Sequence, residues 1–224
     1  MWYLLLPWAI FFSSISIEAA STTSLKPFRA SIPQHAKPLV ILDPGHGGSD
    51  EGAKINFFHE KRITLLTTLA LKKYLEEKDY RVILTRSRDV FVSLERRVSI
   101  ANKTRAVIFV SIHYNASHSA DAKGIEVFYY KGRNASRAKS SKQLADNILS
   151  HLIKGTEADS RGVKAGNFHV IRETDMPAVL VEGGFITNKE ERMLLRDKTY
   201  LNRVAAGIAD GIDHYLRKNA ALPL

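Results

Sequence analysis

Four residues capable of metal or acid–base chemistry stand where predicted strands end or a predicted helix begins. His46 lies in the stretch VILDPGHGGSDEG (residues 40–52), directly after an apolar run. His113 follows the run AVIFVSI, Glu182 follows AVLV, and Glu60 opens a long segment with helical periodicity. Two histidines and one carboxylate are a common ligand set for catalytic zinc, which leaves a fourth position for water.

These residues are expected to meet because the carboxyl ends of parallel strands lie at one edge of a sheet, where ligands bind in open α/β folds. We therefore predict that His46, Glu60 and His113 bind one zinc ion. Zinc lowers the pKa of water and polarises a carbonyl group. Glu182, outside the ligand set, is predicted to act as general base and general acid.

Each residue also has a simpler explanation when it is taken alone. A histidine in a loop is commonly a surface residue, Glu60 would interact favourably with the helix dipole, and Glu182 would be an ordinary charge at a strand end. The DPGHGG turn would also suit a phosphate group at a helix start. However, this loop lacks the Lys-Ser/Thr ending of a P-loop, and the next helix begins more than ten residues later. The four residues together favour the metal site.

Strands and helices are expected to alternate from residue 38 onwards. Strands are predicted at 39–42, 81–85, 106–112, 124–130, 168–171 and 178–181, and helices at 60–78, 94–103, 136–153, 188–195 and 200–216. The 124–130 segment alternates more and is expected nearer an edge. Ser93 is the predicted N-cap of the second helix, with Arg96 and Arg97 on its polar side. The pattern predicts a single α/β domain whose mainly parallel, twisted sheet has helices on both faces.

Composition limits the remaining choices. The chain has 224 residues, of which 45% are hydrophobic and 25% charged, and its formal net charge is +10. A basic surface favours polyanions such as nucleic acid, anionic lipid or an acidic wall polymer. No basic run resembles a nucleic-acid-binding arm, so we predict no nucleic-acid partner. Because the chain has no cysteine, any metal site must use His, Asp or Glu.

The N-terminal segment has the pattern of an export signal. Its apolar run, residues 2–12, is too short to span a bilayer, and small residues follow at Ala19 and Ala20. We predict a signal peptide at 1–20; the absence of Lys or Arg before the run leaves an uncleaved anchor as the alternative. Residues 21–37 are predicted to be a linker, 38–217 the catalytic domain and 218–224 a C-terminal tail.

Six motifs in order resemble the Amidase_3 family of zinc-dependent N-acetylmuramoyl-L-alanine amidases, and the agreement runs over residues 38–217. The motifs are VILDPGHGGSDEGA, HEK, ILTRSRDVFVSLERRVSIAN, FVSIHYNA, GIEVFYY and PAVLVEGGFITNKEE. The resemblance implies hydrolysis, in peptidoglycan, of the amide between the lactyl group of N-acetylmuramic acid and L-Ala of the stem peptide. It places His46, Glu60 and His113 on one zinc ion per chain and makes Glu182 the catalytic glutamate.

Two further residues are weaker candidates for substrate contact. Asn115 follows the ligand His113 by two residues, and His169 would otherwise be a partly buried histidine at a strand end. Some relatives involved in cell division carry an inhibitory helix after the strand that corresponds to GIEVFYY. Here the helical pattern resumes soon after Tyr130, so we predict a site that is open without an activator.

The expected protein is an exported monomer. We predict a periplasmic location, with the cell exterior or wall as the alternative, and association with wall or membrane through the basic surface. Two other functions stay open: a zinc peptidase or carboxypeptidase acting on the stem peptide, and a wall-binding module without catalysis.

Overall fold

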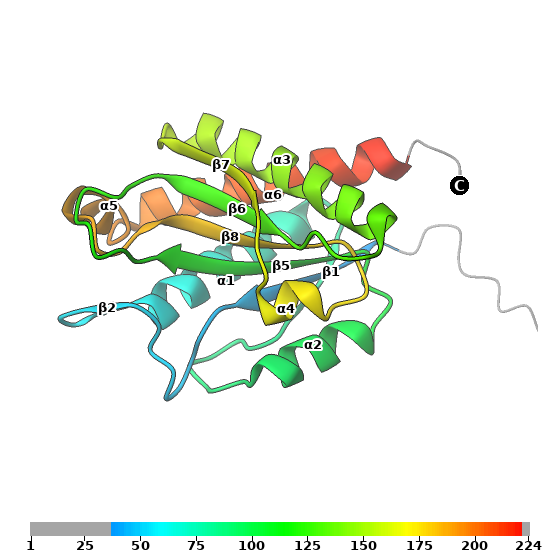
Figure 1. The fold of residues 1–224 in the computed structure, drawn as a ribbon, viewed down its shortest axis with the longest axis horizontal. Helices are drawn as coiled ribbons and strands as arrows, with labels where there is room; N and C mark the ends of the chain where they lie inside the picture. The colour runs from blue at the N-terminus through cyan, green and yellow to red at the C-terminus, as the bar shows by residue number, and fades with distance from the viewer. Residues whose placement is uncertain (1–36, 221–224) are drawn as a thin grey trace, which may run out of the picture. The chain divides into compact units, whose positions relative to one another are not determined.

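A six-stranded sheet in the order β4-β1-β5-β8-β6-β7 forms the centre of the protein (Figure 1). The computed structural model describes residues 37–220, so the predicted signal peptide, nearly all of the predicted linker and the last four residues lie outside the described part. The strands, in sheet order, are Arg81–Leu84, Leu39–Pro44, Ile108–Asn115, Ala178–Phe185, Ile125–Tyr129 and Ser160–Ala165. The first four run parallel; β6 is antiparallel to β8 and parallel to β7. The predicted α/β class with a mainly parallel sheet is confirmed.

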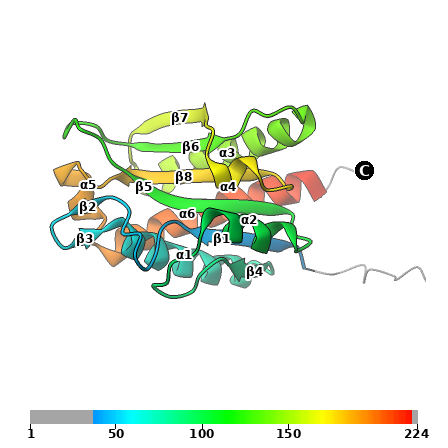
Figure 2. The same cartoon turned by 60° about the horizontal axis from the view of Figure 1, so that its bottom comes forward.

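Helices cover both faces of this sheet, as predicted (Figures 1 and 2). One face carries α1 (Glu60–Glu77), α3 (Ala135–Thr156) and α6 (Lys198–Ala220); the other carries α2 (Leu94–Asn102) and α4 (His169–Arg172). A short helix, α5 (Lys189–Leu194), follows β8, and a hairpin of β2 (Lys54–Ile55) and β3 (Phe58–His59) precedes α1. Within residues 37–220, no helix is both long and apolar enough to cross a bilayer.

The core explains why the central strands are almost continuously apolar. Successive side chains of a strand point to opposite faces, and both faces here are covered. In β1, Val40 and Leu42 pack toward α1, α3 and α6, whereas Ile41 packs toward α2 and α4. All three side chains are fully buried. The same division holds in β5, where Phe109 faces α4.

Two local predictions are wrong. Residues 168–171 form no strand: α4 begins at His169, with the backbone N–H of Arg172 bonded to the carbonyl of Phe168 at 2.9 Å. The run FHVI has β-prone residues but is too short for its periodicity to separate strand from helix. Strand β7 was not expected, because SRGVKA contains one large apolar residue and a glycine. With β7 at the edge, β6 lies one position inside it.

Helices α3 and α6 approach closely where glycines face the partner backbone. A Cβ atom at Gly211 would lie 2.5 Å from the Cα atom of Ile148, and one at Gly207 would lie 3.0 Å from Leu152 Cα. Gly207 and Gly211 lie in α6. At Gly155, which lies in α3, the nearest atom to an added Cβ would be 3.8 Å away, an ordinary contact. The close crossing therefore depends on Gly211 and not on Gly155.

We expect Gly211→Ala to lower the free energy of unfolding by about 1–3 kcal/mol, because the added methyl group forces two backbones apart. The matched change Gly155→Ala should be neutral or stabilising by up to about 1 kcal/mol, because alanine favours helix. Urea unfolding followed by circular dichroism measures both. Equal stability of the two variants would contradict the close packing of α3 on α6.

Candidate active site

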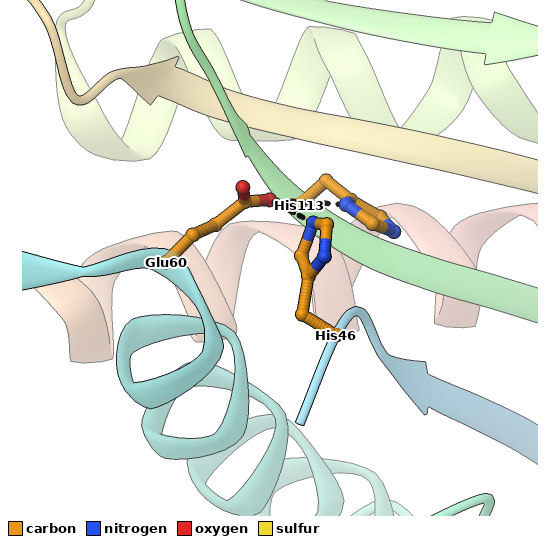
Figure 3. A group of neighbouring side chains, drawn as sticks. All are labelled: His46, Glu60 and His113. Carbon is orange, nitrogen blue, oxygen red and sulfur yellow. Dashed lines mark hydrogen bonds and ion pairs between the residues drawn. The ribbon is translucent and has the colours of Figure 1, made fainter. Parts of the chain in front are cut away.

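Three predicted ligands from distant parts of the chain converge at the carboxyl edge of the sheet (Figure 3). His46 lies on the loop after β1, Glu60 is the first residue of α1, and His113 lies on β5. Glu60 Oε1 is 3.0 Å from His46 Nε2 and 3.0 Å from His113 Nδ1. Ligand atoms of the three residues lie within 4.8 Å of one another. Two imidazoles and a carboxylate at this separation fit a metal ion of the zinc type.

The Glu60 carboxylate is buried, with an exposed fraction of 4%, and is fully paired. Its Oε2 accepts a hydrogen bond from the backbone N–H of Ala53 at 2.8 Å, and Oε1 accepts one from Tyr114 at 3.1 Å. Burial alone would raise the pKa of Glu60, but hydrogen bonds and charge from His113 and His46 outweigh it and hold the pKa well below its usual range. Glu60 is therefore ionised at neutral pH, as a metal ligand must be.

The backbone around His46 is tightly constrained. His46 itself has φ of 60°, in the left-handed region that costs non-glycine residues energy. A Cβ at Gly45 would stand 2.2 Å from Cε1 of His113, and one at Gly52 would stand 2.6 Å from Oε2 of Glu60. The glycines are thus needed so that the loop can pass directly against the other two ligands.

Asp50 orients the His46 ring. Its carboxylate lies 2.9 Å from His46 Nδ1, which leaves Nε2 directed toward Glu60. Burial lowers the pKa of His46, but Glu60 and then Asp50 outweigh that effect and raise it. A carboxylate behind a ligating histidine is a common support of metal sites. Sequence reasoning missed Asp50, although its position four residues after His46 in the same loop was a usable signal.

Two buried arginines, Arg86 and Arg97, donate hydrogen bonds to the backbone of the loop that carries His46. Arg97 was expected on the polar side of its helix, and this is wrong: it is 3% exposed and pairs with Asp43 at 2.7 Å. Its guanidinium also donates to the carbonyls of Pro44 at 2.6 Å and His46 at 2.7 Å. Arg86 donates to the carbonyl of Gly45 at 2.7 Å. The three consecutive carbonyls before and at His46 are thereby fixed.

Glu182 lies beside the ligand group on β8. It pairs in register with His113 of the parallel strand β5, so the two side chains share a face of the sheet. Its Oε2 is buried and accepts no hydrogen bond from the described residues. Burial, and then the charges of Glu60 and Glu126, raise the pKa of Glu182 well above its usual value. A carboxyl group of raised pKa without a fixed partner suits proton transfer.

The two weaker candidates lie outside the ligand group. The side-chain amide of Asn115 donates to Glu126 at 2.7 Å. His169 begins α4 instead of ending a strand, and its Nδ1 lies 3.3 Å from Nη2 of Arg172. Contact of Asn115 or His169 with substrate stays a prediction.

A groove of about 280 Å³ opens beside His46 and His113. Its apolar wall comes from the chain before and within α2 and from α4: Phe91, Val92, Leu94 and Val170. Phe91 and Leu94 are exposed, although both are large apolar residues. The site therefore has an apolar flank on the side of α2 and α4.

Comparison with known proteins gives one consistent family. N-acetylmuramoyl-L-alanine amidase CwlM of Bacillus licheniformis is 39% identical over 186 residues, which cover 81% of this chain and 71% of CwlM. The catalytic domain of the amidase CwlV from Bacillus (Paenibacillus) polymyxa var. colistinus has a TM-score of 0.75 at 40% identity, covering 80% of this chain and 98% of that domain.

A second solved structure, the N-acetylmuramoyl-L-alanine amidase of Clostridium difficile 630, has a TM-score of 0.77 at 35% identity. It matches 81% of this chain and 97% of that protein. Residues 40–214, most of the chain, match the family described as Amidase_3, N-acetylmuramoyl-L-alanine amidase. The chain therefore belongs to the Amidase_3 family.

Proposed function

We propose that this protein hydrolyses the amide bond between the lactyl group of N-acetylmuramic acid and L-Ala of peptidoglycan stem peptides. The observation that carries this proposal is the meeting of the three candidate ligands with the carboxyl group of Glu182 on the neighbouring strand, whose buried Oε2 has no hydrogen-bond partner among the described residues. The family match supports the same reaction.

His46, Glu60 and His113 would hold the metal, for which zinc fits the donor set. When bound, zinc supplies a Lewis acid that lowers the pKa of water and polarises the lactyl carbonyl. The buried Glu60 balances part of the positive charge, and Asp50 keeps the His46 ring in its ligating orientation.

Glu182 moves the proton. Its carboxylate takes a proton from the attacking water and then donates it to the L-Ala nitrogen, which leaves as an amine. The raised pKa of Glu182 favours the first step, because it makes the carboxylate a stronger base. A module that only binds the wall has no use for such a group, so the site favours catalysis over the binding alternative.

Among the described residues, no additional helix lies between β6 and α3. Only residues 130–134 connect β6 to α3, and α3 packs on the face of the sheet opposite α2 and α4. We propose that activity needs no removal of an inhibitory helix. One similar structure, the CwlD amidase of Clostridioides difficile, was solved in complex with the GerS lipoprotein. If this protein were active only with an added partner, the proposal of an open site would be wrong.

The substrate places the enzyme outside the cytoplasm. We propose export by residues 1–20 and action in the periplasm, with the cell exterior as the alternative; a role in cell division, a monomeric state and association with wall or membrane also stay proposals.

Replacing Glu182 by Gln should reduce turnover by about 10²–10⁴-fold, because the amide cannot carry the proton. Zinc content should stay at one ion per chain, since Glu182 is not a ligand. Release of peptides from purified sacculi and elemental analysis measure the two effects. Glu190→Gln, an exposed change on α5, is the control. Turnover by the Glu182→Gln variant at the wild-type rate would refute the assignment.

Removal of metal should abolish activity, and zinc should restore it. His113→Ala should lose both the metal and the activity, because two ligands remain. His151→Ala, which lies on α3, should lose neither. The metal content and rate of each protein are measured before and after chelation. Full activity in a metal-free sample would contradict a metal-dependent mechanism.

The purified protein alone should cleave sacculi, and mass spectrometry should find intact stem peptides with a free L-Ala amino group. Shortened stem peptides still attached to glycan would instead indicate the peptidase or carboxypeptidase alternative. Inactivity that is relieved by an added partner would contradict the open site.

A further inference from the structure

A second buried carboxylate, Glu126, lies next to Glu182. Glu126 of β6 pairs in register with Glu182 of β8 on one side and with Gly162 of β7 on the other. Its side chain is 6% exposed. At one level of the sheet, the order is therefore His113, Glu182, Glu126 and then the edge strand β7. Neighbouring strands are about 4.8 Å apart, so Glu126 lies about 10 Å across the sheet from His113.

Three donors from two segments surround Glu126. Its Oε1 accepts from the Asn115 amide at 2.7 Å, and its Oε2 accepts from Arg161 Nε at 3.1 Å and from the Lys164 ammonium group. Two cations therefore meet the one carboxylate of Glu126. A structural ion pair would have needed only one of them.

The two cations differ in their remaining contacts. Arg161 also donates to the carbonyl of Lys123 at 3.2 Å, and its guanidinium carbon lies 4.9 Å from the ring centre of Phe185. Among the described residues, Lys164 has no acceptor besides Glu126, and its side chain is 41% exposed. An ammonium group has three N–H donors. Lys164 thus has donors facing solvent, whereas Arg161 is held in place.

The direction of the leaving peptide follows from Glu182, and this step rests on the proposed function. Glu182 donates its proton to the L-Ala nitrogen, so the peptide lies on the Glu182 side of the ligands. Beyond Glu182 on that side come β6 and β7, with Glu126 and Lys164. Two extended residues span about 7 Å. The second residue of the stem peptide therefore comes within reach of the Lys164 side chain.

We propose that Lys164, held by Glu126, binds a free carboxylate on the second residue of the stem peptide. A stem peptide whose second residue is glutamate linked through its side chain carries this group as an α-carboxylate, and amidation converts it to a neutral carboxamide. A charge-assisted hydrogen bond favours the carboxylate. Lys164 would thus make the enzyme sensitive to amidation of its substrate.

Two synthetic muramoyl peptides that differ only in this carboxylate or carboxamide test the proposal. Wild-type enzyme should cleave the carboxylate form with kcat/KM about tenfold higher, mainly through a lower KM. Lys164→Met should remove the preference, and Lys164→Arg should retain most of it. Lys142→Met, which removes the same charge from α3, should leave the preference unchanged. A preference that persists in Lys164→Met, or its absence in wild type, would overturn the assignment.

Binding of the released peptides separates this inference from the proposed reaction. Calorimetry with the free stem peptides needs no turnover, and the carboxylate peptide should bind wild type about tenfold more tightly than the carboxamide peptide. Equal affinities would overturn the role of Lys164 even in an active amidase. Conversely, a Lys164-dependent difference in a protein that cleaves neither substrate would sustain the subsite while refuting the reaction.

Discussion

The candidate metal centre depends on the burial of one carboxylate, Glu60. A buried charge is costly unless it is paired and hydrogen-bonded, and Glu60 obtains its partners from three separate segments. The backbone N–H of Ala53 comes from the loop before the hairpin, that of Tyr114 from β5, and the imidazoles from His46 and His113. The start of α1 is thereby fixed against the strand and the loop. The contacts that pair the buried Glu60 carboxylate also bring the candidate ligand atoms together. The same contacts therefore stabilise the start of α1 and set the geometry of the ligands.

The loop that carries His46 shows how a strained backbone is kept in place. A left-handed conformation at a non-glycine residue costs about 1–2 kcal/mol. Arg97 and Arg86 offset this cost, because they donate to the consecutive carbonyls of the loop. Asp43 in turn accepts from Arg97 and from the hydroxyl groups of Thr85 and Ser111, so that the buried guanidinium is itself paired. Asp43 and Arg97 therefore support the loop that carries His46 and do not contact the reacting atoms.

Sequence alone predicted those features that depend on local pattern. The buried strands were found because both of their faces are apolar. The candidate ligands were chosen because His46 and His113 follow predicted strands and Glu60 begins a predicted helix. Arg97 was placed wrongly, because a long side chain can turn from a polar helix face into a buried pair that no periodicity reveals. Strand β7 was missed because an edge strand with Gly162 lacks an apolar pattern. The neighbourhood of Glu126 could not be predicted, since the pairing of β6 with β8 joins residues that are fifty or more positions apart in the sequence.

Because β6 is antiparallel to β8, it places Glu126 at the edge of the sheet that carries the candidate site. In a parallel sheet, only the carboxyl ends of strands reach the ligand edge. Because β6 runs the other way, its first residues lie at that edge, and Glu126 stands opposite Glu182. Strand β7 follows β6 in direction and brings Lys164 to the same wall. The opposite flank, with Phe91 and Leu94, is apolar. Reversal of one strand therefore makes the two sides of the candidate metal centre chemically different.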